Sequence, residues 1–166
     1  IFLEMVRKLP DNDVTIETDP SYKTIITCEK AKFNIIGKSG EDFSSLPQIE
    51  RSDSILLTQF TLKEVIRQTS FSIADNFTNK ILTGELFEIH GNILKVVSSD
   101  GLRISLRKIE LKNDYGNKKV IVPGKTLNEI SKILSGDADK DISIFFADKH
   151  IIFEFDNTVI VSRLIE

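Results

Sequence analysis

The side chains that most often carry out chemistry in proteins are sparse in this sequence and form no recognisable catalytic or metal-binding pattern. The two histidines, His90 and His150, each lie beside a predicted turn, and together with a single cysteine they form no recognisable metal-ligand pattern. Cys28 lies inside a predicted strand and is interpreted as a half-buried small residue rather than a nucleophile. The run PGKT at 123–126 lacks the upstream glycine of a phosphate-binding loop. We therefore expect a protein that is not an enzyme, without cofactor or metal ion.

The composition limits the other possibilities. The chain has 166 residues, a net charge of −3 and 40% hydrophobic residues, enough for a packed core. Its longest apolar run is far shorter than the roughly 20 residues that cross a bilayer. A single cysteine excludes an intrachain disulfide and favours a reducing, cytoplasmic location. Because the sequence starts inside a predicted helix and ends directly after a predicted strand, we expect a piece of a longer protein.

The most distinctive stretch is a predicted hairpin over residues 96–106. Two alternating runs meet at Asp100-Gly101, a dipeptide that readily takes the positive φ values of a tight turn. Beyond the turn, one face of the second strand carries three apolar residues: Leu102, Ile104 and Leu106. The other face carries Arg103 and Ser105. An isolated Asp-Gly turn is ordinarily only a solvent-exposed tip, so its role depends on the elements around it.

Hydrophobic periodicity predicts helices over 1–9, 62–71 and 124–135. Thr61 is the predicted N-cap of the second helix, with Glu64 at the spacing of a capping box, and Gly136 is the predicted end of the third. The expected inner faces of these two helices are Leu62, Val65, Ile66 and Thr69, and Leu127, Ile130 and Leu134. Strands are predicted over 13–18, 22–27, 32–38, 54–59, 84–90, 93–98, 102–110, 118–122, 141–146, 149–155 and 158–164. Residues 39–53 are rich in turn-forming and acidic residues and indicate a linker.

These elements form an internal repeat. The order strand–helix–strand–strand–strand occurs twice in full and once without its first strand. The helices align without gaps, with glutamate at 4, 64 and 129 and a basic residue three positions later at 7, 67 and 132. This predicts an α+β fold of duplicated β-α-β-β-β units whose helices cover one face of antiparallel sheets. Residues 51–166 would pair two units in one domain, and residues 1–50 would be half of another.

Charge is distributed unevenly between helices and the rest of the chain. The predicted helices carry six basic residues against three glutamates, in a chain that is acidic overall: Arg7, Lys8, Lys63, Arg67, Lys125 and Lys132. If all helices lie on one side of the sheets, that side is mildly positive and suits a phosphate backbone without sequence reading. Ordinary solvated helix faces with Glu–Arg neighbours are the alternative explanation.

The sequence as a whole resembles the β subunit of bacterial DNA polymerase III, the sliding clamp or processivity factor. The matching segments run through the whole chain in order: 7–10 (RKLP), 43–47 (FSSLP), 83–88 (TGELFE), 96–106, 120–125 (VIVPGK) and 161–166 (VSRLIE). The resemblance implies the DNA clamp fold, a dimeric ring of three similar domains per subunit with helices facing duplex DNA. The chain would supply the second half of domain 1 and most of domain 2, with domain 3 absent.

The resemblance also implies site residues and partners. A cleft for short linear motifs of the polymerase α subunit, the clamp loader and repair polymerases would include Leu82, Ser99, Asp100, Gly101, Leu102, Arg103 and Ile104. Position 102 is often His in relatives and is Leu here. The DNA-facing residues would be Arg7, Asn76, Lys125 and Lys132, to which the helix repeat adds Lys63 and Arg67. An α+β small-molecule-binding domain or enzyme is the alternative function, and it would need convergent titratable groups in a pocket between helix and sheet.

Overall fold

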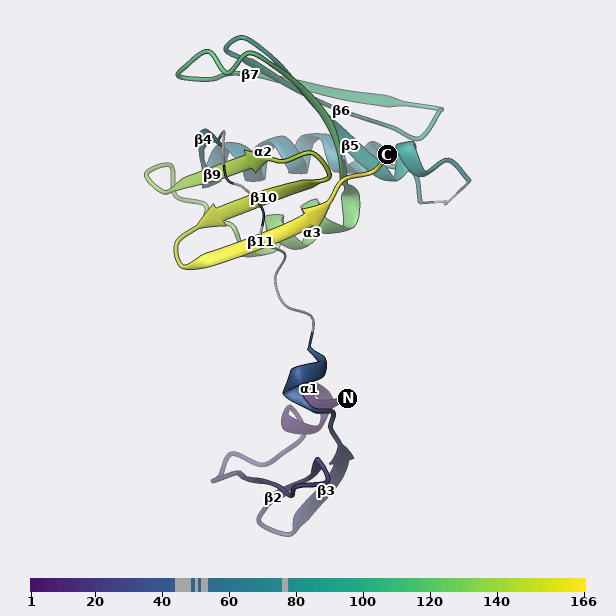
Figure 1. Cartoon of the computed structure of the whole chain (residues 1–166), viewed down its shortest axis with the longest axis vertical. Coiled ribbons are helices and arrows are strands. Elements are labelled where there is room, and N and C mark those ends of the chain that lie inside the picture. The colour runs from purple at the N-terminus through teal and green to yellow at the C-terminus, as the bar shows by residue number, and fades with distance from the viewer. Residues whose placement is uncertain (44–48, 50, 52–53, 76–77) are drawn as a thin grey trace. The chain divides into compact units, whose positions relative to one another are not determined.

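A computed structural model of the chain describes residues 1–43, 49, 51, 54–75 and 78–166 (Figure 1). The chain divides into two compact units, Ile1–Leu46 and Pro47–Glu166, which are described separately. No helix among the described residues is long and apolar enough to cross a membrane.

The first unit contains a small antiparallel sheet and a short helix. The sheet has the order β1-β2-β3, formed by β1 (Thr15–Thr18), β2 (Lys23–Cys28) and β3 (Ala31–Ile36). The helix α1 (Phe2–Val6) is shorter than the predicted 1–9 and buries none of its residues, and a 3-10 turn, η1, spans Gly40–Asp42. Only Ile26 and Cys28 are buried among the hydrophobic residues described in this unit. Its remaining apolar side chains are at least partly open to solvent.

The second unit contains both complete repeats. The first repeat is β4 (Ser54–Thr58), α2 (Gln59–Thr69), β5 (Gly84–His90), β6 (Ile93–Ser99) and β7 (Ile104–Glu110), with 3-10 turns η2 (Ser70–Ser72) and η3 (Lys80–Thr83) before β5. The second repeat is β8 (Asn117–Pro123), α3 (Gly124–Ile133), β9 (Asp141–Phe146), β10 (His150–Phe155) and β11 (Thr158–Arg163). The predicted α+β fold of duplicated units is confirmed.

The two repeats exchange their first strands. The sheet orders are β7-β6-β5-β8 and β11-β10-β9-β4, so β8 completes the sheet of the first repeat and β4 completes that of the second (Figure 1). Both exchanged strands pair antiparallel, β8 with β5 from Gly84↔Pro123 to His90↔Asn117 and β4 with β9 from Ser54↔Phe145 to Thr58↔Asp141. Periodicity had identified the repeats but not this exchange.

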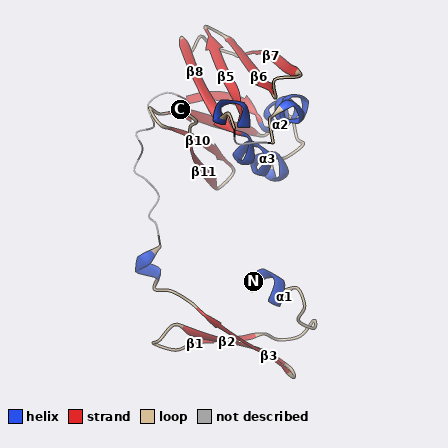
Figure 2. Cartoon of the chain, turned by 90° about the vertical axis from the view of Figure 1, so that its right-hand side faces the viewer, coloured by secondary structure: helices blue, strands red, loops and turns tan. Residues whose placement is uncertain are grey.

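One hydrophobic core joins both sheets and both helices. Helices α2 and α3 lie next to each other against the sheets (Figure 2). The predicted inner face of α2 is buried at all four positions, and so are Leu127, Ile130 and Leu134 at α3. All of them except Thr69 belong to one hydrophobic cluster with Ile55 of β4, Phe87 of β5, Val122 of β8 and Phe153 of β10. The apolar stripe of each helix therefore faces a core that neither repeat encloses alone.

Gln59 connects the two repeats through polar contacts within this core. The side chain is fully buried at the start of α2. Its Nε2 donates to the carbonyl oxygen of Asp141 (3.3 Å), and its Oε1 accepts from the backbone N–H of Ser135 (2.9 Å). The backbone N–H of Gln59 donates to the carbonyl oxygen of Lys140 (2.7 Å). One residue thus satisfies backbone groups that follow α3 in the other repeat.

The N-cap of α2 is Thr58, and the predicted Thr61 cap is wrong. The helix begins at Gln59, and the Thr58 hydroxyl oxygen accepts a hydrogen bond from the backbone N–H of Thr61 (3.1 Å). The strand β4 ends at Thr58, so the chain passes from strand to helix without a loop. Glu64 bonds Arg67 instead of reaching back to a cap. The third helix also ends earlier than predicted, at Ile133.

Replacing the cap tests this assignment. We expect Thr58→Ala to lower the free energy of unfolding by about 1 kcal/mol, because the N–H of Thr61 then loses its acceptor. Thr58→Ser should restore most of this loss, whereas Thr61→Ala should have a smaller effect. Urea denaturation followed by circular dichroism measures all three variants. A larger loss for Thr61→Ala than for Thr58→Ala would contradict the assignment.

Candidate functional site

The hairpin between β6 and β7 has a longer loop than the sequence predicted. Ser99 pairs with Ile104, so the connection comprises the four residues 100–103, and β7 starts at 104 instead of 102. Gly101 has a φ of +91°, a backbone conformation that side chains with a Cβ rarely adopt. The Asp-Gly pair is therefore the first half of the loop.

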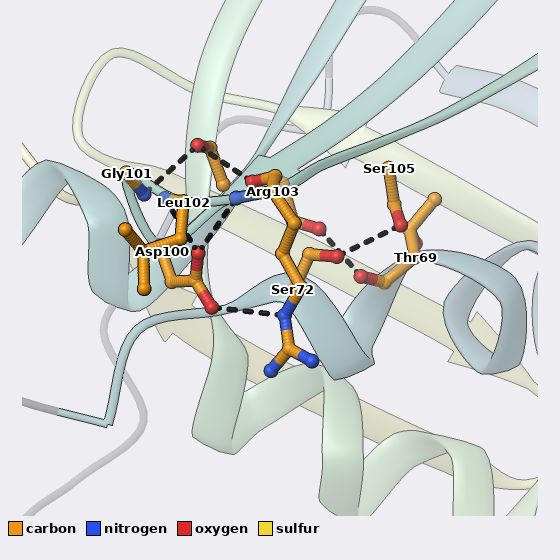
Figure 3. A network of polar contacts seen from close by, with 9 residues as sticks. Thr69, Ser72, Asp100, Gly101, Leu102, Arg103 and Ser105 are labelled. Atoms are coloured by element: carbon orange, nitrogen blue, oxygen red, sulfur yellow. Dashed lines mark hydrogen bonds and ion pairs between the residues drawn. The ribbon is translucent and has the colours of Figure 1, made fainter.

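Side chains within the hairpin close this loop. The carboxylate of Asp100 accepts from the backbone N–H groups of Leu102 (2.9 Å) and Arg103 (3.0 Å), and its second oxygen accepts from Arg103 Nε at 2.9 Å (Figure 3). The two backbone N–H groups, followed by the guanidinium, hold the pKa of Asp100 below its usual value. The Ser99 hydroxyl accepts from the N–H of Gly101 and donates to the carbonyl oxygen of Arg103. Ordering of the loop therefore does not depend on a ligand.

The apolar face of β7 points to solvent, and its serine points to the interior. Leu102, Ile104 and Leu106 are 97%, 72% and 50% exposed. Ser105 is buried and shares a hydrogen bond of 2.9 Å with the hydroxyl of Ser72 in η2 (Figure 3). Ile104 and Leu106 share one face of β7 as predicted, and that face is the outer surface of the sheet, whereas Leu102 lies in the loop before the strand.

An apolar pocket of about 290 Å³ opens on this outer surface. It is lined by residues of η3, β5, β6 and β8: Ile81, Leu82, Gly84, Leu86, Val97, Ser98, Ser99, Lys119 and Ile121. Val122 and Ile165 pack closely against the backbone of Gly84. A Cβ added at this position would lie 2.5 Å from the carbonyl oxygen of Val122 and 2.8 Å from Ile165 Cδ1. The pocket thus combines strands of both repeats.

The structure brings together some of the predicted cleft residues and separates others. Leu82 and Ser99 line the pocket. Ile104 pairs with Ser99 across the strands and lies on the same face of the sheet. Arg103 instead lines a second hollow, where its guanidinium carbon lies 5.8 Å from the ring centre of Phe71. Asp100, Gly101 and Leu102 form the hairpin loop described above.

Sequence reasoning missed seven of the nine pocket residues: Ile81, Gly84, Leu86, Val97, Ser98, Lys119 and Ile121. Leu86 pairs with Val97 on one side and with Ile121 on the other, which places all three on the outer face. Strand alternation could have placed each residue on a face. Only the register of the exchanged strand β8 brings Lys119 and Ile121 beside the others.

The second hollow, of about 730 Å³, lies between η2 and the start of α3. Its basic lining residues are Arg103, Lys125 and Lys132. Lys132 bonds the carboxylate of Glu129 at 2.8 Å, while the exposed Phe71 and Asn128 also line the hollow. Two residues predicted to face DNA therefore lie together on the helix side of this unit.

The other predicted DNA-facing residues have different surroundings. Lys63 donates from its ammonium group to the carbonyl oxygen of Leu134 (2.8 Å), a contact between the two repeats. Arg67 forms a two-bond ion pair with Glu64, which lowers the pKa of that carboxyl. Arg7 follows α1 in the first unit and is exposed. Asn76 lies outside the described residues.

A buried polar cluster lies between β5 and α2. Glu85 of β5 is fully buried, and Oε2 lies 2.8 Å from the Thr69 hydroxyl, while Oε1 has no hydrogen-bond partner among the described residues. Burial raises the pKa of Glu85 to about 7, and the Thr69 hydroxyl opposes part of this rise when it donates to the ionised carboxylate. The Thr69 hydroxyl also contacts the carbonyl oxygen of Val65 (2.8 Å) and has only one proton to donate. A protonated Glu85 satisfies both contacts, because it can donate to Thr69 while Thr69 donates to Val65.

Across residues 1–43, 49, 51, 54–75 and 78–166, no three His, Cys, Asp or Glu side chains gather in a group that could hold a metal ion. Cys28 is buried, and its sulfur lies 3.7 Å from the carbonyl oxygen of Pro10.

The fold and the two surfaces define a class of protein: a duplicated α+β domain with exchanged strands, an apolar pocket on one sheet and basic side chains at its helices. Residues 56–166 match the DNA polymerase III beta subunit, central domain, and residues 1–47 match the DNA polymerase III beta subunit, N-terminal domain. The chain belongs to the DNA polymerase III beta subunit family, as its sequence indicated.

Individual relatives agree with this family. The beta sliding clamp of Staphylococcus epidermidis is 38% identical over 165 residues, which are 99% of this chain and 44% of the relative. A crystal structure from Eubacterium rectale, assigned to the DNA polymerase III beta subunit, is 70% identical with a TM-score of 0.85, over 99% of this chain and 45% of that one. The crystal structure of the Bacillus subtilis DNA polymerase sliding clamp is 36% identical with a TM-score of 0.84, over 99% of this chain and 43% of that one. The chain thus spans less than half the length of these relatives.

The buried carboxyl of Glu85 predicts a specific pH dependence of stability. The pKa of Glu85 in the folded state lies above its ordinary value of 4.5. The contribution of this carboxyl to the free energy of unfolding is therefore complete below pH 4.5 and is lost as the pH rises through about 7. We expect the free energy of unfolding to fall by about 2–3 kcal/mol between pH 5 and pH 8 from this group. Glu85→Gln keeps a donor for Thr69 and should remove that part of the slope. Urea denaturation across this range measures it, and an unchanged slope in the variant would contradict the prediction.

Proposed function

We propose that this chain is part of a DNA sliding clamp subunit, a non-catalytic protein that encircles duplex DNA and tethers the replicative polymerase. The observation that carries the proposal is the family match in both units, over residues 1–47 and 56–166. Because the chain spans 44% of its curated relatives, the activity belongs to the longer protein of which such a chain is a part.

In the proposed assembly, DNA is held mainly by enclosure in a ring. Arg7, Lys125 and Lys132 supply weak contacts with phosphate groups, without reading the base sequence. Lys63 and Arg67 contribute less, because Lys63 donates to a backbone carbonyl oxygen of the other repeat and Arg67 makes two hydrogen bonds to Glu64, whereas Lys132 makes one to Glu129. The acidic net charge is compatible with this arrangement, since closure of the ring, and not affinity, keeps the protein on DNA.

The pocket beside the hairpin is proposed to receive short linear motifs of the polymerase α subunit, the clamp loader and repair polymerases. Its lining from Leu82, Leu86, Val97 and Ile121 suits apolar side chains of an extended peptide. Ile104 and Leu106 extend the apolar surface beyond the pocket.

The first unit is proposed to be half of a separate clamp domain, with residues 51–166 forming most of the next. Each sheet of the second unit contains four strands, the fourth donated by the other repeat, whereas the sheet of the first unit has three. Ile16 of β1 and Ile36 of β3 are 51% and 88% exposed, as expected for a sheet that lacks its partner repeat. Two subunits of the full-length protein would then close the dimeric ring.

Retention on circular DNA tests the proposed tether. The full-length protein, loaded by its clamp loader onto a nicked circular plasmid, should remain bound during gel filtration in salt that removes ordinary DNA-binding proteins. Cutting the plasmid once should release it, because a ring slides off a free end. Equal retention on the circular and the linear form would overturn the proposal, since it would indicate direct binding in place of enclosure.

The pocket has its own test. We expect Leu82→Ala in the full-length protein to weaken binding of a fluorescent peptide carrying the polymerase's clamp-binding motif by about tenfold, through lost apolar contact. Ile93→Ala is the matched control, because Ile93 is also apolar and partly exposed on the outer face but lies at the far end of β6. Fluorescence anisotropy measures both variants. If Ile93→Ala weakened binding as much as Leu82→Ala, the pocket would not be the site.

A further inference from the structure

The outer face of the sheet β7-β6-β5-β8 is divided into an apolar row and a charged row. Cross-strand pairing places Ile121, Leu86, Val97 and Leu106 in one row. A second row lies beside the first, displaced by two residues along each strand. The same pairing places Lys119, Glu88, Lys95 and Lys108 in it. Adjacent residues on one face of a strand are about 7 Å apart, so the two rows are in direct contact.

Lys119 connects these two rows. It lines the apolar pocket, and among the described residues of that lining it is the one with a charged side chain. Its position on β8 is two residues before Ile121, which also lines the pocket. The long methylene chain of a lysine can follow an apolar wall while its ammonium group stays at the rim.

The charge of Lys119 is only partly balanced. Its ammonium group lies 3.9 Å from Glu88 Oε1, and its side chain is 69% exposed. The other oxygen of Glu88 accepts from Lys95 at the shorter distance of 3.1 Å, and this hydrogen bond is the main reason that the pKa of Glu88 is lowered. The row thus holds three lysines and one glutamate, with an excess of positive charge.

We propose that Lys119 selects, among apolar peptides that enter the pocket, those with a carboxylate next to the apolar side chain. This inference rests on the proposed function of the pocket as a peptide site. An extended peptide advances about 3.3–3.5 Å per residue, so a carboxylate one to three positions from the residue in the pocket lies within reach of the ammonium group. Because the Lys119 side chain is 69% exposed, this attraction is that of a surface ion pair and is screened by salt. The carboxylate comes either from an acidic side chain or from the C-terminus of the partner.

Matched peptides distinguish these sources. Binding of acetyl-Gly-Leu-Leu-Phe-Asp-Gly-amide to the full-length protein is compared with that of the same peptide containing Asn in place of Asp. A second pair, acetyl-Gly-Leu-Leu-Phe as free acid and as amide, presents the carboxylate at the chain terminus. Fluorescence anisotropy competition against the labelled polymerase motif measures all four affinities at low and at raised salt.

For the wild-type protein we expect one carboxylate-bearing peptide to bind about fivefold more tightly than its neutral partner, with a preference that declines as salt increases. If the Asp/Asn pair shows the preference, the carboxylate recognised is a side chain; if the free acid/amide pair shows it, the carboxylate is a C-terminus. Lys119→Met should abolish the preference while leaving the neutral peptides bound as before, and Lys119→Arg should keep it. Lys108→Met, which removes the same charge from the same row outside the pocket, should leave it intact.

Other outcomes separate this inference from the function on which it rests. If all four peptides bound equally and Leu82→Ala weakened each of them, the pocket would be a peptide site without the selectivity assigned to Lys119. If the preference survived in Lys119→Met, another group would be responsible and the inference would be wrong. If none of the peptides competed with the polymerase motif, both the peptide site and its selectivity would be overturned.

Discussion

The exchange of first strands between the two repeats is the constraint on which the second unit depends. Without β8, the sheet of the first repeat would end at β5 with unpaired backbone groups, and without β4 the same would hold for β9. The single core draws Ile55 and Val122 from the exchanged strands, so hydrogen bonding and apolar burial support the same arrangement. Gln59 strengthens it by satisfying backbone groups of the opposite repeat. Each repeat thus supplies the fourth strand of the other repeat's sheet.

This exchange also builds the surfaces to which we assign function. The apolar pocket takes Leu86 and Val97 from the first repeat and Lys119 and Ile121 from the second, so it exists only in the paired structure. On the helix side, Phe71 and Arg103 from the first repeat and Lys125 from the second line one hollow. The hairpin contributes differently to these surfaces: Ser99 lies at the pocket, and Arg103 lies at the hollow. One short loop thus connects a surface suited to peptides with a surface suited to phosphate groups.

Much of the fold could be predicted from the sequence because its signals are local. The alternation of β5, β9 and their neighbours fixed strand positions closely, and the stripe of α2 fixed its buried face at all four positions. The spacing of Thr61 and Glu64 matches a capping box and therefore predicts a cap at Thr61. The actual cap is Thr58, because strand β4 runs directly into the helix there. The pocket could be predicted only in part, through Leu82 and Ser99. Lys119 and Ile121 reach the pocket through the long-range register between β5 and β8, which no local pattern encodes. The burial of Glu85, a charged residue type in a core-facing position, was likewise not evident.

The strand exchange has a further consequence for how such a chain could arise and be divided. The segment between β7 and β8, residues 111–116, connects the repeats, while the exchanged strands hold them together. Two separate copies of one repeat could exchange strands in the same way and form a two-fold symmetric dimer. Gene duplication and fusion would then convert that dimer into a single chain, after which the two halves could diverge. A cut in the connecting segment should accordingly yield two fragments that reassemble by complementation, each completing the sheet of the other.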